Sequence, residues 1–120
     1  EMPFKLGGRS PKSGFDSPGF ANYVLKQSGV ELAEERNQFL SVSMMNQLKA
    51  TEQPRPGDLM FFEGSTGNFV LFYLGIGKDG GPGVGAGHLN SNMLTGIYDT
   101  KQFAQKFKGY YQVQYPDEQP

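Results

Sequence analysis

A glycine-rich turn near the start of the chain leads into a helical pattern and places Ser17 at its beginning. The segment GFDSPGFANYVLKQSG runs from Gly14 to Gly29. Backbone N–H groups at a helix start stabilise a developing negative charge, so a small polar residue there is a candidate nucleophile. A serine also needs an adjacent base to become nucleophilic. The alternative is that Ser17 or Asp16 only caps the helix.

His88 is the single histidine of the chain and the natural candidate for such a base. It follows a glycine-rich stretch and is flanked by Gly87 and Leu89. A histidine in this setting is more often a structural or surface residue than a catalyst. A catalytic pair of Ser17 and His88 and a purely structural role for both therefore remain open.

The composition excludes several classes of site. The chain contains no cysteine, which rules out a thiol nucleophile, a disulfide framework and cysteine-ligated zinc. With one histidine and no cysteine we expect no metal site and no cofactor. The net charge is −1 without a basic stripe, so nucleic acid is not an expected partner. We also expect no membrane span and no signal segment within the chain, which starts at Glu1.

The hydrophobic patterns place helices first and strands afterwards, which predicts an α+β fold. Pro18 suits the first helical position and Gly29 the position after the last turn. Phe20, Tyr23, Val24 and Gln27 share one helical face and are expected to enter the core. The remaining expected elements are helical pieces at 32–40 and 43–50, strands at 59–64, 68–77, 84–89, 93–99 and 109–115, and a short helix at 100–107. Residues 1–115 are predicted to form one domain, with a loose tail at 116–120.

The segments PFKLGG, SGFDSPGFANYVLKQSGVEL, RPGDLMFF and FYLGIG occur in that order, beginning at Pro3, Ser13, Arg55 and Phe72. As an ordered set they resemble the NlpC-type cell-wall peptidases, bacterial papain-like cysteine peptidases. The resemblance implies a papain-like α+β domain with N-terminal helices packed on a small antiparallel sheet. It also implies a nucleophile at a helix start, a base on a neighbouring strand and the stem peptide of peptidoglycan as substrate. The implied location is the bacterial cell envelope, periplasmic or extracellular.

The residues that carry the family's chemistry differ in this chain. The family cysteine falls on Ser17, and the family base histidine falls on Asn68 or Phe69. Phe4 replaces a family tyrosine, and His88 is the only candidate near the third polar position. The resemblance predicts that Phe4, Asp16, Ser17, Asn68, Phe69 and His88 line the remnant cleft.

These departures favour a catalytically inactive NlpC-type domain that binds peptidoglycan stem peptide or a protein of the cell envelope. The first alternative is a peptidoglycan endopeptidase or amidase that is inactivated by a Cys-to-Ser change at Ser17, or that uses Ser17 with His88. A further alternative is a structural or assembly component of a secretion or phage-tail machine. Whether the chain is an enzyme is left open by the sequence.

Overall fold

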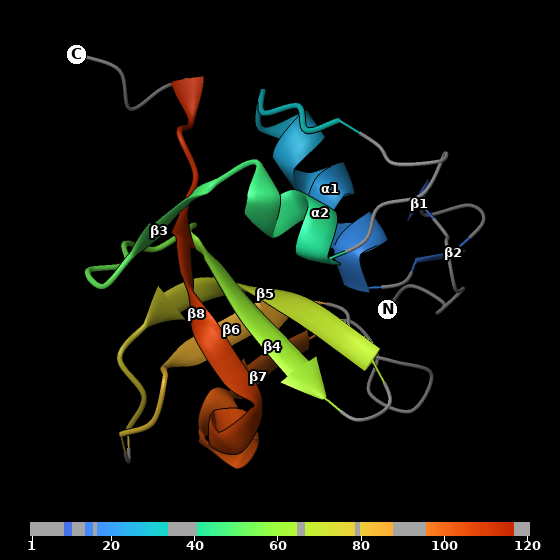
Figure 1. Ribbon diagram of the computed structural model, residues 1–120. Helices are drawn as coiled ribbons and strands as arrows, with labels where there is room; N and C mark the ends of the chain where they lie inside the picture. Colours follow the sequence, from blue (N-terminus) through green and yellow to red (C-terminus); the bar gives the residue numbers. More distant parts are fainter. Residues whose placement is uncertain are drawn as a thin grey trace.

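Two short helices pack on one side of a six-stranded antiparallel sheet (Figure 1). The computed structural model describes residues 9–10, 14–15, 17–33, 41–64, 67–78, 80–87 and 96–116. The sheet has the order β3-β8-β4-β5-β6-β7, and every pair within it is antiparallel. The predicted α+β class is confirmed. The elements are β1 (Arg9–Ser10), β2 (Gly14–Phe15), α1 (Ser17–Gln27), α2 (Ser41–Asn46), β3 (Lys49–Thr51), β4 (Leu59–Gly64), β5 (Gly67–Gly75), β6 (Val84–Gly87), β7 (Gly96–Asp99), the 3₁₀-helix η1 (Thr100–Lys106) and β8 (Phe107–Gln112).

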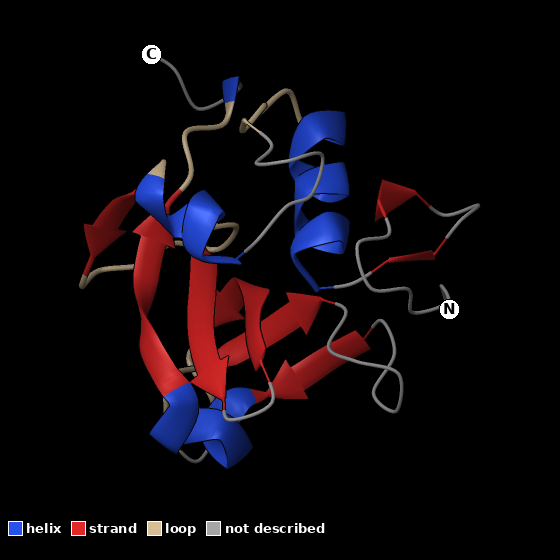
Figure 2. Cartoon of the chain, turned by 45° about the vertical axis from the view of Figure 1, so that its right-hand side comes forward, coloured by secondary structure: helices blue, strands red, loops and turns tan. Residues whose placement is uncertain are grey.

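Helix α1 ends where the sequence predicts, at a glycine with a left-handed backbone. Gly29 has a φ of 87°. Its N–H donates to the carbonyl of Lys26, and the N–H of Val30 donates to the carbonyl of Leu25 at 2.8 Å. This pair of bonds is the Schellman arrangement, which satisfies carbonyls that the last turn leaves without helical partners. The short β1–β2 hairpin lies beside the same helix (Figure 2).

The buried face of α1 differs from the predicted one. Ala21 and Leu25 are fully buried, whereas Phe20, Tyr23 and Val24 are half-buried and Gln27 is exposed. Ala21 and Leu25 lie four residues apart and therefore on one face of the helix. The small residues of the first turns allow close approach to β5, so the larger aromatic side chains remain at the margin.

The predicted helical piece at 43–50 is correct only in its first half. Helix α2 ends at Asn46, and Lys49 and Ala50 belong to β3. Strand β3 pairs antiparallel with β8, opposite Tyr110 to Gln112. Pairing with a strand more than fifty residues away overrides the local helical preference, which no nearby pattern reveals. The piece at 32–40 lies largely outside the described residues.

Strands β4 and β5 form the centre of the sheet and are buried on both faces, as the continuous apolar sequence predicts. Alternate residues enter two different clusters. On the helix side, Leu59, Phe61, Val70 and Phe72 pack with α1 and α2. On the other side, Met60, Phe62, Leu71 and Tyr73 pack with aromatic residues from β7, η1 and β8.

The last third of the chain folds as the sequence predicts in type and order. The glycine-rich stretch after β5 leads into β6, and these two strands pair antiparallel. Asp99 caps η1 by accepting a hydrogen bond from the N–H of Lys101 at 3.1 Å. The division into a domain at 1–115 and a tail at 116–120 stays a prediction.

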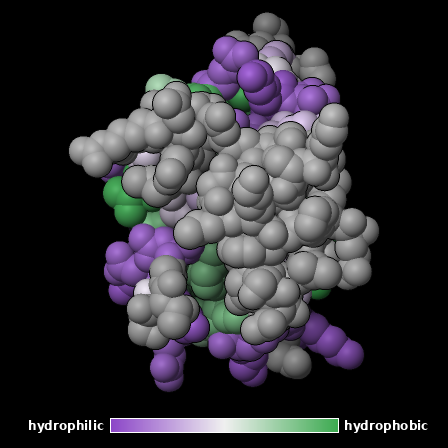
Figure 3. Space-filling model, turned by 90° about the vertical axis from the view of Figure 1, so that its right-hand side faces the viewer, coloured by the Kyte–Doolittle hydropathy of each residue, from purple (hydrophilic) through white to green (hydrophobic). Residues whose placement is uncertain are grey.

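Some large apolar side chains lie on the surface. Ile76 and Ile97 are 88% and 71% exposed, and Val42 and Leu74 are partly exposed. On the face that Figure 3 shows, hydrophilic residues gather at the upper and lower ends and hydrophobic atoms appear between them. Within the described residues, no helix has the length and apolar character required to cross a membrane.

Candidate functional site

Ser17 is buried at the first residue of α1, and its hydroxyl is bonded to the sheet. The side chain is 3% exposed. Its Oγ–H donates to the carbonyl oxygen of Val70 at 3.0 Å, and the same Oγ accepts a hydrogen bond from the N–H of Val70 at 2.9 Å. The structure therefore corrects the interpretation of the Ser17 hydroxyl as a helix cap. Its bonds go to strand β5 instead.

The backbone of Val70 has no β6 partner among the described residues and is bonded to Ser17 instead. The register of β5 with β6 begins at Phe72, opposite Ala86. The N–H and C=O of one strand residue point to the same side, so both groups of Val70 can reach one neighbouring atom. The Ser17 hydroxyl takes the place that a strand partner would occupy. It is thereby a junction between helix and sheet, and its proton is directed at a carbonyl that cannot remove it.

Phe69, at one of the two positions where the resemblance puts the base, packs into an aromatic cluster. Its ring stacks on Phe62 at a centroid distance of 4.8 Å with an interplanar angle of 7°. It also meets Phe103 edge-on at 5.3 Å. Phe62 is fully buried, so this arrangement is part of the second core. The aromatic ring supplies no proton acceptor to Ser17.

Asn68 is the other position that the resemblance assigns to the base. It is half-buried and lies opposite Glu63 in the β4–β5 pair. Side chains alternate along a strand, which places Asn68 on the face of Val70 and of helix α1, and Phe69 on the opposite face. A carboxamide on the helix side can accept and donate hydrogen bonds to a ligand, but it does not act as a base near neutral pH.

Three of the predicted site residues lie outside the described residues: Phe4, Asp16 and His88. Their place in the cleft stays a prediction. His88 directly follows Gly87, the last residue of β6. In the described part of the chain, no group of three histidine, aspartate or glutamate residues could hold a metal ion.

Sequence reasoning missed the principal partner of Ser17, which is the backbone of Val70. The two residues are 53 positions apart, and a main-chain partner leaves no side-chain signal in a sequence. It also missed Phe62 and Phe103 as neighbours of Phe69. The alternation of β4 could have suggested Phe62, because Phe62 and Phe69 face each other in the β4–β5 register.

Two solved structures share the fold over nearly the whole chain. The NlpC/p60 domain of the peptidoglycan hydrolase SagA superposes with a TM-score of 0.68 at 23% identity, covering 93% of this chain and 87% of that one. An NlpC/P60 family protein from Bacillus cereus ATCC 10987 gives a TM-score of 0.70 at 22% identity, covering 92% of this chain and 35% of that one. At these identities the likeness concerns the fold.

Curated relatives align over much of the chain. Gamma-DL-glutamyl hydrolase of Bacillus subtilis is 32% identical over 107 residues, which is 87% of this chain and 24% of that protein. The probable endopeptidase p60 of Listeria welshimeri is 35% identical over 77 residues, which is 62% of this chain and 14% of that protein. The chain thus spans about a quarter or less of the length of these relatives. The model of the NlpC/P60 family matches residues 1–113, and the chain belongs to this family.

Proposed function

We propose that this NlpC/P60 domain binds peptidoglycan stem peptides and does not cleave them. The observation that carries the proposal is the double hydrogen bond between the Ser17 hydroxyl and the backbone of Val70. A nucleophilic serine needs its proton taken by a base during attack. Here the proton is donated to a main-chain carbonyl, and one of the two oxygen lone pairs already accepts an N–H.

The neighbourhood of Ser17 supports the same conclusion. Phe69 occupies a position where the family resemblance expects a base, and its ring is held against Phe62 and Phe103. Turning a different side chain of β5 toward Ser17 would require a shift of register, which would move every alternating core residue of the strand to the wrong face. A helix N-terminus helps a thiolate, but a serine hydroxyl has a pKa too high to profit from it.

The ligand class rests on what the relatives are named for. Their names concern gamma-glutamyl bonds, peptidoglycan and endopeptidase activity. A domain that keeps the fold of such hydrolases, with no base beside its serine among the described residues, is suited to hold the same kind of peptide. Asn68, on the helix side of β5, provides an amide for such a ligand, and Phe4, Asp16 and His88 are proposed to complete the cleft. A cell-envelope location, periplasmic or extracellular, is part of this proposal.

The test combines a peptidoglycan pull-down with analysis of released fragments. It uses the unaltered chain, Ser17→Cys, Asn68→His and the double variant, because residue 68 is the expected base position that lies on the helix side of β5. Ser28→Cys is a matched control at the exposed end of α1. We expect binding by the unaltered chain, and no fragment release by the unaltered chain or by either single variant. Release by the double variant only would show that both lost groups are needed.

Three other outcomes would contradict the proposal in different ways. Fragment release by the unaltered chain at an ordinary enzymatic rate would make it an active hydrolase that uses Ser17 with His88. Release by Ser17→Cys, but not by Ser28→Cys, would make it a peptidase that Ser17 keeps inactive. If the chain does not bind peptidoglycan, the ligand proposal fails and a protein partner in the envelope becomes the next candidate.

A further inference from the structure

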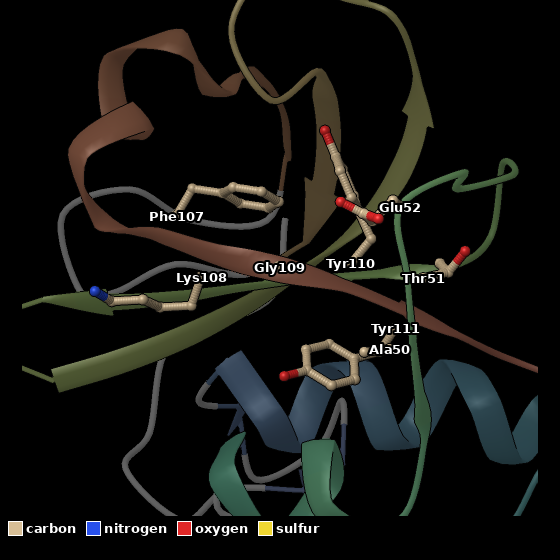
Figure 4. A pocket seen from close by; sticks show the side chains of 8 residues that line it. All are labelled: Ala50, Thr51, Glu52, Phe107, Lys108, Gly109, Tyr110 and Tyr111. Atoms are coloured by element: carbon tan, nitrogen blue, oxygen red, sulfur yellow. The ribbon is translucent and has the colours of Figure 1, made fainter.

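A pocket of about 570 Å³ lies at the edge of the sheet, where β3 and β8 diverge. It contains neither Ser17 nor Asn68 nor Phe69, and it is independent of the function proposed above. Figure 4 shows the pocket and the side chains around it. Its walls are Ala50, Thr51 and Glu52 at the end of β3, and Phe107, Lys108, Gly109, Tyr110 and Tyr111 of β8.

The backbone of β8 is open along this pocket. Strand β3 is three residues long and pairs only with Tyr110 to Gln112. Beyond Thr51 the chain turns away, and no strand of the described residues pairs with the outer edge of β8 from Phe107 to Gly109. The N–H of Phe107 already donates to the carbonyl of Ala104. An edge without a strand partner presents its remaining outward N–H and C=O groups to an extended peptide.

Gly109 keeps this edge accessible. The atom nearest to a Cβ added at Gly109 would be Cε1 of Tyr111, at 3.7 Å. The space over Gly109 is therefore open, and an incoming backbone can approach it closely. A lysine and a bulge are common means of protecting a sheet edge from pairing, and Lys108 lies at a shift of the β4–β8 register. Protection by itself does not account for a hollow of this volume beside the edge.

The charges at the two ends of the pocket select one direction for a peptide. Glu52 lies where β3 ends, and Lys108 lies farther along β8; both are exposed, and Figure 4 shows them on opposite sides of the pocket. A peptide that continues the direction of β3 runs antiparallel to β8, with its N-terminal end beside Glu52 and its C-terminal end beside Lys108. The opposite direction suits only a peptide with the reversed charge pattern.

We propose that this edge of β8 is a docking site for a short extended peptide that adds to the sheet as a strand in line with β3. The peptide carries a basic residue toward its N-terminal end and an acidic residue toward its C-terminal end. The open stretch of three residues spans about 10 Å at the rise of a β-strand, which fits a segment of about five residues with its flanking charges.

The experiment is an NMR titration of the ¹⁵N-labelled chain with the end-blocked peptide KVTVE. The matched peptides are EVTVK, which has the charges reversed, and KVTVE with N-methyl groups on alternate residues. We expect amide shifts at Thr51, Lys108 and Gly109, and binding of KVTVE at least about threefold tighter than binding of EVTVK, as two exposed ion pairs predict. The N-methylated peptide should bind much more weakly, because strand addition depends on backbone hydrogen bonds.

Charge-reversed variants complete the test. Glu52→Lys combined with Lys108→Glu should reverse the preference between KVTVE and EVTVK. Lys26→Glu combined with Glu31→Lys reverses exposed charges elsewhere and should leave the preference unchanged. The proposal is overturned if Gly109 does not shift at millimolar peptide, if N-methylation has no effect, or if the preference is the same in both double variants. A dimer formed through this edge would also overturn it, because the occupant would then be a second copy.

Discussion

The Ser17 hydroxyl and the backbone of Val70 hold helix α1 against strand β5 through two hydrogen bonds of 3.0 and 2.9 Å. Both residues are buried, so water does not compete for these groups. The residue that the family resemblance assigns to the nucleophile is in this chain a structural junction. The same two bonds engage both the proton and the oxygen of the hydroxyl, which is the observation behind the proposed lack of cleavage.

Replacing Ser17 by alanine should destabilise the protein measurably. The N–H and C=O of Val70 would lose their side-chain partner in a buried place, at a cost of about 1–3 kcal/mol. Urea unfolding followed by circular dichroism measures this loss. Ser28→Ala is the control, because the exposed Ser28 hydroxyl donates to the carbonyl of Val24 and water can replace it. Equal losses in the two variants would contradict the role of Ser17 as a junction.

Replacing Asp58 by asparagine should destabilise the protein. It is buried, its Oδ1 accepts the N–H of Val113 at 3.1 Å and its Oδ2 accepts the N–H of Arg55 at 2.9 Å. In Asp58→Asn one acceptor becomes an NH₂ group that faces an N–H, and we expect a loss of about 1.5–3 kcal/mol in unfolding free energy.

Asp99→Asn provides the matched control for this measurement. Asp99 is exposed and caps η1, and asparagine caps a helix about as well as aspartate. Its unfolding free energy should therefore change little. If Asp58→Asn is as stable as Asp99→Asn, the two bonds of Asp58 do not stabilise the turn before β4.

Gly83 should not tolerate a side chain. Its φ is +132°, and an added Cβ would lie 2.6 Å from Cε1 of Tyr73 and 2.7 Å from the carbonyl oxygen of Gly75. We expect Gly83→Ala to lower the unfolding free energy by about 3 kcal/mol or more, since backbone strain and a steric clash act together.

Gly80 offers a control with the same backbone handedness and no clash. Its φ is +86°, and no atom lies within 4 Å of an added Cβ. Gly80→Ala should cost only the left-handed backbone strain, about 1 kcal/mol. A thermal melt of the two variants measures the difference, and a larger loss for Gly80→Ala would refute the packing argument.

Stability should fall at alkaline pH partly because of Tyr110. Burial, and secondarily the neighbouring Tyr73, raises the pKa of Tyr110 above its usual value of 10.0. The folded state then binds this proton more tightly than the unfolded state. The stabilisation is fully present below about pH 10 and is lost as the pH rises through the folded-state pKa.

Urea midpoints between about pH 8 and about pH 11 test this dependence on both sides of the tyrosine pKa. Tyr110→Phe also removes the hydrogen bond from the Tyr110 hydroxyl to the carbonyl of Pro82, so the variant should start less stable. Its midpoint should then decline less steeply above pH 10 than that of the unaltered chain. Parallel curves for the two proteins would exclude Tyr110 as a source of the alkaline loss.

The local sequence was sufficient to predict those helices and strands whose conformation is decided by neighbouring residues. Proline at the start and glycine after the end delimit α1, and continuous apolar runs identify β4 and β5. The local sequence did not predict that Lys49 and Ala50 form a strand, because they follow helix formers and yet pair with β8. It also did not predict the buried face of α1. There, close packing buries Ala21 and Leu25 in place of the larger Phe20 and Tyr23. In both cases a distant partner outweighs the local preference.

The sequence by itself determined the family, the order of the elements and the absence of a thiol nucleophile, because these depend on residue identity and on short-range patterns. Only the tertiary structure decided what Ser17 does. Its partner is a main-chain group 53 residues away, to which the described part of β6 contributes no pairing residue. The same holds for Phe69, whose ring direction follows from the register of β5 against β4 and from the aromatic cluster that this register assembles.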